Sequence, residues 1–154
     1  METLTVPMES IAELIDVQLS HGDRANLIVT GSSMLPMLHH RRDSVILAPV
    51  GQTVKKGEII LYRRSNGRYI LHRVVGLSGE DYICCGDNQA VRELVTKRQI
   101  LAVVVGFTRK GRVYGTDAPG YRLYKTFWVG AFPIRRYFLV LRRLLGRLRR
   151  KLSK

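Results

Sequence analysis

Near the start of the chain, apolar residues recur at the three- and four-residue spacing of one helix face. They are Ile11, Leu14, Ile15 and Leu19. Ser10 fits the position of an N-cap, and Gly22 fits that of a helix stop. The pattern predicts a short packing helix within residues 1–25.

Between residues 26 and 114 the pattern changes to short runs rich in β-branched and aromatic residues. The runs read NLIVTG, DSVILAPV, GEIILYRR, RYILHRVVGL, DYICCG and QILAVVVGF. Turn-forming stretches such as SNG and LSGED separate them, as in hairpins and short loops. We therefore predict a mainly β fold, with a compact and mostly antiparallel β domain over residues 26–114.

The C-terminal part divides into two segments. Residues 115–134 begin with the turn-forming stretch GTDAPGY and carry five aromatic residues, so we predict a loop and an aromatic segment there. Residues 135–154 show an apolar stripe at three- and four-residue steps, with basic residues on the other faces. The stripe consists of Phe138, Leu141, Leu145, Leu148 and Leu152. This pattern predicts a basic amphipathic helix over residues 135–154.

Composition and charge indicate what kind of partner the chain meets. With 154 residues, of which 45% are hydrophobic, it is long enough for one domain with a substantial core. Its formal net charge is +14, and residues 135–154 hold nine Arg and Lys but no acidic residue. A charge of this size favours an anionic partner.

The basic helix has three possible roles. Its stripe can pack on the β domain while its charges stay in water, or the helix can lie in the plane of an anionic membrane surface. In the membrane case Phe127, Trp128 and Phe132 would act as interfacial anchors. Nucleic acid is the least favoured partner, because the segment lacks base-reading polar residues and spaced stacking aromatics.

Several segment types and site types are not expected in this chain. The N-terminus lacks a basic start followed by an apolar run, and no stretch reaches the roughly 18 apolar residues of a spanning helix. We therefore expect neither a signal peptide nor a transmembrane helix, and a location in the cytoplasm or at the periphery of the cytoplasmic membrane. The adjacent Cys84 and Cys85 match neither a zinc site nor a disulfide framework. We predict both to be buried in a strand, and we predict no metal and no cofactor.

Candidate catalytic residues lie in or directly after three of the strand-like runs. Ser33 lies in the turn GSSM after a predicted strand, where a serine hydroxyl can be exposed. A serine nucleophile needs a base within hydrogen-bond reach, and His72 in RYILHRVVG is the candidate. Asp87 in CCGDNQ is placed to orient an imidazole or to cap a turn. Each residue alone is more typical of a structural role, so only the ordered set is informative.

That ordered set resembles the signal peptidase I family of serine peptidases. The match covers roughly residues 27–106. Its blocks are GSSMLP at 31–36, RDSVIL at 42–47, KKGEIILY at 55–62, HRVVG at 72–76 and GDN at 86–88. The stretch VTGSSM also resembles the self-cleaving domains of SOS-response repressors, which share that fold. In HRVVG the histidine is followed by arginine, and in this the sequence resembles the Ser-His members of the signal peptidase family.

The resemblance implies a role for each motif residue. Ser33 would be the nucleophile, His72 the general base and Asp87 the residue that fixes the imidazole tautomer. The oxyanion and substrate-binding residues would come from the same loop, and they are Gly31, Ser32, Met34 and Pro36. The implied activity is a serine endopeptidase that cleaves leader or signal-like peptides by an acyl-enzyme mechanism. The alternative is a catalytically silent β module that binds an extended peptide or regulates another protein.

Overall fold

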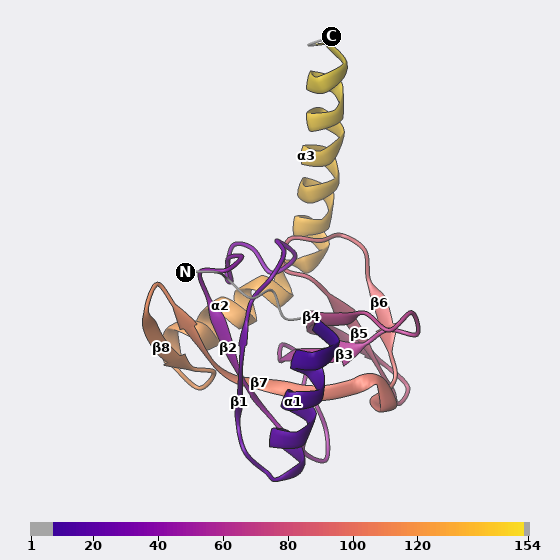
Figure 1. The fold of residues 1–154 in the computed structure, drawn as a ribbon. Coiled ribbons are helices and arrows are strands. Elements are labelled where there is room, and N and C mark those ends of the chain that lie inside the picture. The colour runs from indigo at the N-terminus through magenta and orange to yellow at the C-terminus, as the bar shows by residue number, and fades with distance from the viewer. Residues whose placement is uncertain (1–7, 153–154) are drawn as a thin grey trace.

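In the computed structural model, which describes residues 8–152, eight strands form one antiparallel sheet (Figure 1). Seven of them follow the order β1-β2-β7-β3-β4-β5-β6, and β8 pairs with β7. The strands are β1 (Ala25–Ile28), β2 (Ser44–Ala48), β3 (Ile59–Arg63), β4 (Tyr69–Ser78), β5 (Asp81–Cys85), β6 (Glu93–Val95), β7 (Ile100–Arg109) and β8 (Arg112–Gly115). The predicted fold class, mainly antiparallel β with an N-terminal helix and C-terminal helical structure, is confirmed.

The central strand β3 carries residues of two hydrophobic cores. Because successive side chains of a strand point to opposite faces, Ile59 and Leu61 enter one core while Ile60 and Tyr62 enter the other. All four side chains are buried, because a hydrophobic core packs on each face of the strand. The continuous apolar run IILY is therefore explained by burial on both faces.

Helices lie at both ends of the chain. Helix α1 (Met8–Ser20) contributes Ile15 and Leu19 to the first core, as the periodicity predicted. Helix α2 (Pro119–Gly130) packs Tyr121 on the same core, and helix α3 (Phe132–Leu152) extends away from the sheet (Figure 1). A 3-10 turn, η1 (Lys97–Gln99), leads into β7. Among the helices within residues 8–152, none has the length and apolar content needed to cross a membrane.

Some elements differ from the sequence predictions. The segment 115–134, predicted as a loop with aromatic residues, contains helix α2, because Pro119 occupies the first helical turn, where a missing N–H costs nothing. Helix α3 begins at Phe132, ahead of the predicted residue 135. Strands β6 and β8 were not predicted, since each is only three or four residues long. Cys84 and Cys85 are buried at the end of β5, as predicted.

Candidate active site

Ser33 lies on a loop between β1 and β2 whose base is closed by backbone hydrogen bonds. The N–H of Val29 donates to the carbonyl of Asp43 at 2.9 Å, and the N–H of Arg41 donates to the carbonyl of Val29 at 2.8 Å. Gly31 turns the chain with φ of 84°, a conformation that favours glycine. The next side chain after Ser33, Met34, is buried in the core. Ser33 is thus held half-buried at the tip of an anchored loop.

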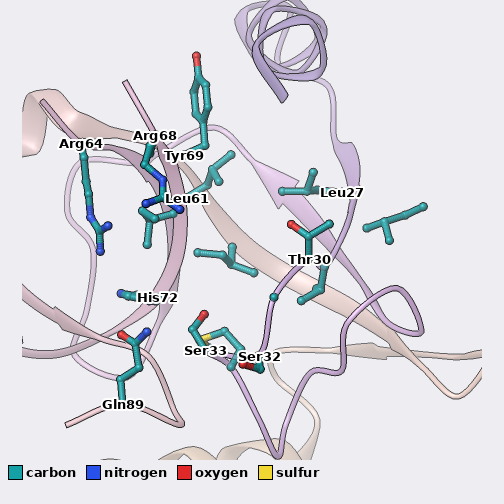
Figure 2. Close-up of a pocket in the computed structure, with 16 residues that line it drawn as sticks. Leu27, Thr30, Ser32, Ser33, Leu61, Arg64, Arg68, Tyr69, His72 and Gln89 are labelled. Carbon is teal, nitrogen blue, oxygen red and sulfur yellow. The ribbon is translucent and has the colours of Figure 1, made fainter. Parts of the chain in front are cut away.

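Ser33 and His72 lie near each other (Figure 2), and both lie close to Gly86. A Cβ atom at Gly86 would lie 3.1 Å from Ser33 Cβ and also 3.1 Å from His72 Nε2. His72 belongs to β4, and its side chain is buried. No hydrogen bond joins Ser33 Oγ to the imidazole among the described residues, although Nε2 is the ring nitrogen on the serine side. The structure therefore brings the predicted nucleophile and the predicted base together.

A cavity of about 390 Å³ opens beside this pair. Figure 2 shows Ser33 and His72 on its lining, with Gln89, Arg64 and Arg68 around the same space. The end of β1, the middle of β3 and the first part of β4 supply apolar residues to the lining. They are Leu27, Ile28, Val29, Leu61, Ile70 and Leu71. The cavity is therefore lined by apolar residues from three neighbouring segments and by polar residues that include Ser33 and His72.

The second ring nitrogen of His72 is held from the opposite side. Its Nδ1 lies 3.2 Å from the hydroxyl oxygen of Tyr62, and that hydroxyl donates to Glu93 Oε2 at 3.0 Å. Because the only hydroxyl hydrogen of Tyr62 points to Glu93, the Tyr62 oxygen accepts a hydrogen bond from His72 Nδ1–H. This tautomer leaves the lone pair of Nε2 facing Ser33. Arg64 binds the Glu93 carboxylate, with its Nε 2.7 Å from Oε2.

The protonation states suit a general base at His72. Burial lowers the pKa of His72 to about 4, even though the charge of Glu93 acts in the opposite direction. The imidazole is therefore neutral at physiological pH. Burial alone would raise the pKa of Glu93, but hydrogen bonds from Arg64 and Tyr62 outweigh it and lower that pKa. Glu93 is accordingly an anion, and its Oε1 lies 3.7 Å from His72 Nδ1.

Asp87 does not orient His72, so its predicted role is wrong. Its buried carboxylate is bound in bidentate fashion by Arg73, with both N···O distances at 2.8 Å, and Tyr124 Oη lies 3.3 Å from it. Arg73 follows His72 in β4, so its side chain points to the opposite face of the strand. The Asp87 carboxylate therefore pairs with Arg73. The His72 imidazole is contacted by Tyr62 and Glu93 instead.

The Arg73–Asp87 pair serves the site by holding the turn that contacts the serine loop. Within that turn, the N–H of Asn88 donates to the Ser33 carbonyl at 2.7 Å, and Asn88 Nδ2 donates to the Ser32 carbonyl at 3.3 Å. The turn thereby fixes the backbone of the predicted nucleophile.

The predicted oxyanion and substrate-binding residues separate into two groups. Gly31, Ser32 and Met34 line the cavity, whereas Pro36 does not. The Pro36 carbonyl accepts a hydrogen bond from Arg109 at 3.4 Å. Including Pro36 in the site was therefore wrong. The N–H of Gly31 donates to His40 Nδ1 at 2.9 Å, so it is not free to bind an oxyanion.

The N–H of Ser33 is a candidate oxyanion donor at this loop. Within residues 8–152 it donates to no other group, so it is available to an incoming carbonyl oxygen. His40 is engaged with Gly31, and neither His39 nor His40 lines the cavity. His72 is therefore the histidine positioned for proton transfer with Ser33.

Taken together, the fold and the site define an antiparallel β protein with a Ser-His pair on the lining of a cavity that has both polar and apolar walls. Comparison with models of known protein families finds no match, and comparison with curated proteins finds none either. The function is accordingly argued from the residues and their geometry.

Proposed function

We propose that this chain is a serine endopeptidase of the signal peptidase I type, with Ser33 as nucleophile and His72 as general base. The observation that carries the proposal is the closeness of both side chains to Gly86, where an added Cβ would lie 3.1 Å from Ser33 Cβ and 3.1 Å from His72 Nε2. The fixed tautomer of His72 and the adjoining cavity support it. A structural histidine would not need a free Nε2 beside a serine.

The reaction follows from these positions. His72 Nε2 accepts the proton of Ser33 Oγ–H while the oxygen attacks the scissile carbonyl carbon. The resulting oxyanion accepts a hydrogen bond from the Ser33 N–H. The imidazolium then gives its proton to the leaving amine, and the C–N bond breaks to leave an acyl-enzyme. Water, deprotonated by His72, attacks this ester and releases the acid product and Ser33.

Glu93 and Tyr62 take the role that was predicted for Asp87. His72 must become an imidazolium during the reaction, although burial lowers its pKa to about 4. The anionic Glu93, which reaches Nδ1 through the Tyr62 hydroxyl, offsets part of this penalty. It acts when the positive charge forms, so its contribution is to kcat rather than to substrate binding.

The substrate is an extended peptide that lies between β1 and β4. Strand β1 pairs only with β2 among the described strands, and residues 69–72 of β4 pair with β3 before β5 joins at Arg73. Both strands therefore leave one edge free beside the cavity, where a peptide can add backbone hydrogen bonds. By the resemblance to signal peptidases, the substrates would be leader or signal-like peptides with small residues before the cut.

Covalent labelling with a fluorophosphonate probe tests this proposal. We expect one phosphonyl adduct on Ser33, located by peptide mapping, and no adduct in the His72→Ala variant. The rate should be constant near neutral pH and should fall with acid around a midpoint of about 4, because only the neutral imidazole accepts the proton. Ser32→Ala serves as the control and should label normally. An adduct on another serine, or a midpoint near the usual histidine value of about 6.5, would contradict the proposal.

Gly86 offers a second test, because it touches both catalytic side chains. In Gly86→Ala the new methyl group would lie 2.7 Å from the Ser33 carbonyl oxygen, a backbone atom that cannot rotate away. We expect the labelling rate to fall at least about tenfold, since a displacement of one ångström costs that much or more. Gly51→Ala is the matched control, because nothing lies within 4 Å of a Cβ there. Equal rates for the two variants would show that the contact at Gly86 does not position Ser33.

A further inference from the structure

Helix α3 presents an apolar row to solvent. Ile134, Phe138, Leu141 and Leu145 follow one another at four-, three- and four-residue steps, so they share one helix face. Their side chains are between 53% and 77% exposed. We call these four residues the apolar row. Leu148 and Leu152 of the predicted stripe lie outside the residues whose side chains the structure describes.

Arginines hold α3 against the rest of the protein. Arg135 is buried, stacks on the rings of Trp128 and Phe132, and donates to the Asp87 carbonyl. Two turns further along, Arg142 Nη2 donates to Asn88 Oδ1 at 2.9 Å. The helix therefore contacts the domain with a mixed face, on which Phe132 and Leu139 are buried as well as Arg135, while the apolar row lies outside this contact. The sequence left open whether the apolar stripe packs on the β domain, and the exposure of Phe138, Leu141 and Leu145 contradicts that alternative.

We propose that the apolar row docks α3 on the surface of an anionic phospholipid bilayer. Residues 135–154 carry nine Arg and Lys and no acidic residue, so an anionic surface complements their charge. In-plane binding places the apolar row at the boundary of headgroups and acyl chains while the long basic side chains reach the phosphates. An anionic bilayer therefore accommodates both the apolar row and the basic side chains.

A nucleic acid or a second copy of the helix would suit either the basic residues or the apolar row, but not both. A nucleic acid would neutralise the basic residues but leave the apolar row in water. A second copy of the helix would cover the apolar row but bring nine cations close to nine others without an acidic residue between them. The proposal rests on α3 alone and does not depend on peptidase activity.

Vesicle co-sedimentation of the full chain tests the docking. At physiological salt we expect binding to vesicles of phosphatidylcholine with phosphatidylserine and much weaker binding to phosphatidylcholine alone. The variant F138S/L141S/L145S should bind the anionic vesicles at least about tenfold more weakly, because it removes most of the inserted area. The matched control is L77S/L94S/V113S, which replaces three exposed apolar residues of the sheet and should bind like the original chain. Equal melting temperatures for both variants verify that the fold is intact.

Four outcomes overturn the proposal. The chain can stay in the supernatant with anionic vesicles, or the apolar-row variant can bind as tightly as the control variant. In sedimentation velocity without vesicles, a dimer that only the apolar-row variant dissociates would identify a second copy as the occupant. Tighter binding of a DNA duplex than of anionic vesicles, unaffected by the apolar-row substitutions, would identify nucleic acid.

Discussion

Ser33→Ala is expected to lower kcat/KM for a peptide with small residues before the cut by at least about a thousandfold, because no covalent intermediate can then form. Ser32→Ala should retain activity within a few-fold. Ser32 is exposed, and it is its backbone carbonyl, rather than its hydroxyl, that binds Asn88. The two serines are adjacent in the sequence, so the pair of variants controls for disturbance of the loop. Initial rates on a fluorogenic peptide, with melting temperatures for both variants, provide the measurement.

The same assay identifies the base. His72→Ala should lose about as much activity as Ser33→Ala, and the double variant should lose no more, because members of a catalytic unit are not additive. His40→Ala should affect activity less, through the hydrogen bond that it removes from Gly31. If Ser32→Ala alone abolished cleavage, or if the effects of Ser33→Ala and His72→Ala multiplied, the assignment of the pair would be wrong.

The periodicity of the sequence predicts most of the fold because burial acts residue by residue. The β-rich runs correspond to β1 to β5 and β7, and the apolar period near the N-terminus corresponds to α1. Strand β6 is only three residues long, Glu93–Val95, so no period can be recognised in it. The sequence does not predict helix α2, because Pro119 and Gly120 are typical of turns. Proline is nevertheless well tolerated in a first helical turn.

Motifs in the sequence predict the proposed catalytic pair, but they do not identify the carboxylate on the far side of His72. Asp87 and Glu93 both follow β5, and which of them reaches His72 depends on strand register rather than on spacing in the sequence. In the antiparallel pairing of β3 with β4, His72 lies opposite Ile60, so Tyr62, two residues along, shares its face of the sheet. That register places the Tyr62 hydroxyl between His72 and Glu93. A hairpin pairing assumed from the turn SNG would have identified Tyr62 from the sequence.

The position of α3 likewise needed the tertiary structure. Its hydrophobic period is the same whether the apolar stripe faces the sheet or the solvent. The deciding contacts are those of Arg135 and Arg142 with the turn that carries Asp87 and Asn88. These contacts also join the proposed membrane-docking helix to the turn that holds the Ser33 carbonyl.

Substitution of Asp87 should mainly lower stability, whereas substitution of Glu93 should mainly lower kcat. Asp87→Ala leaves the Arg73 guanidinium, which is fully buried, without its partner. Breaking a buried ion pair in this way costs about 3–5 kcal/mol of unfolding free energy. For a chain of this size that corresponds to a fall in melting temperature of about 10 °C. Chemical denaturation and thermal melts measure it.

Glu93→Gln should leave the stability nearly unchanged and lower kcat. Its side chain is partly exposed, so the free energy of unfolding should change by no more than about 1 kcal/mol. The neutral amide no longer stabilises the imidazolium, so kcat should fall about tenfold while KM stays the same. Since the charge of Glu93 raises the pKa of His72, its loss should also move the acid midpoint of activity to lower pH. A stable Asp87→Ala protein with impaired kcat, together with a fully active Glu93→Gln protein, would return the orienting role to Asp87.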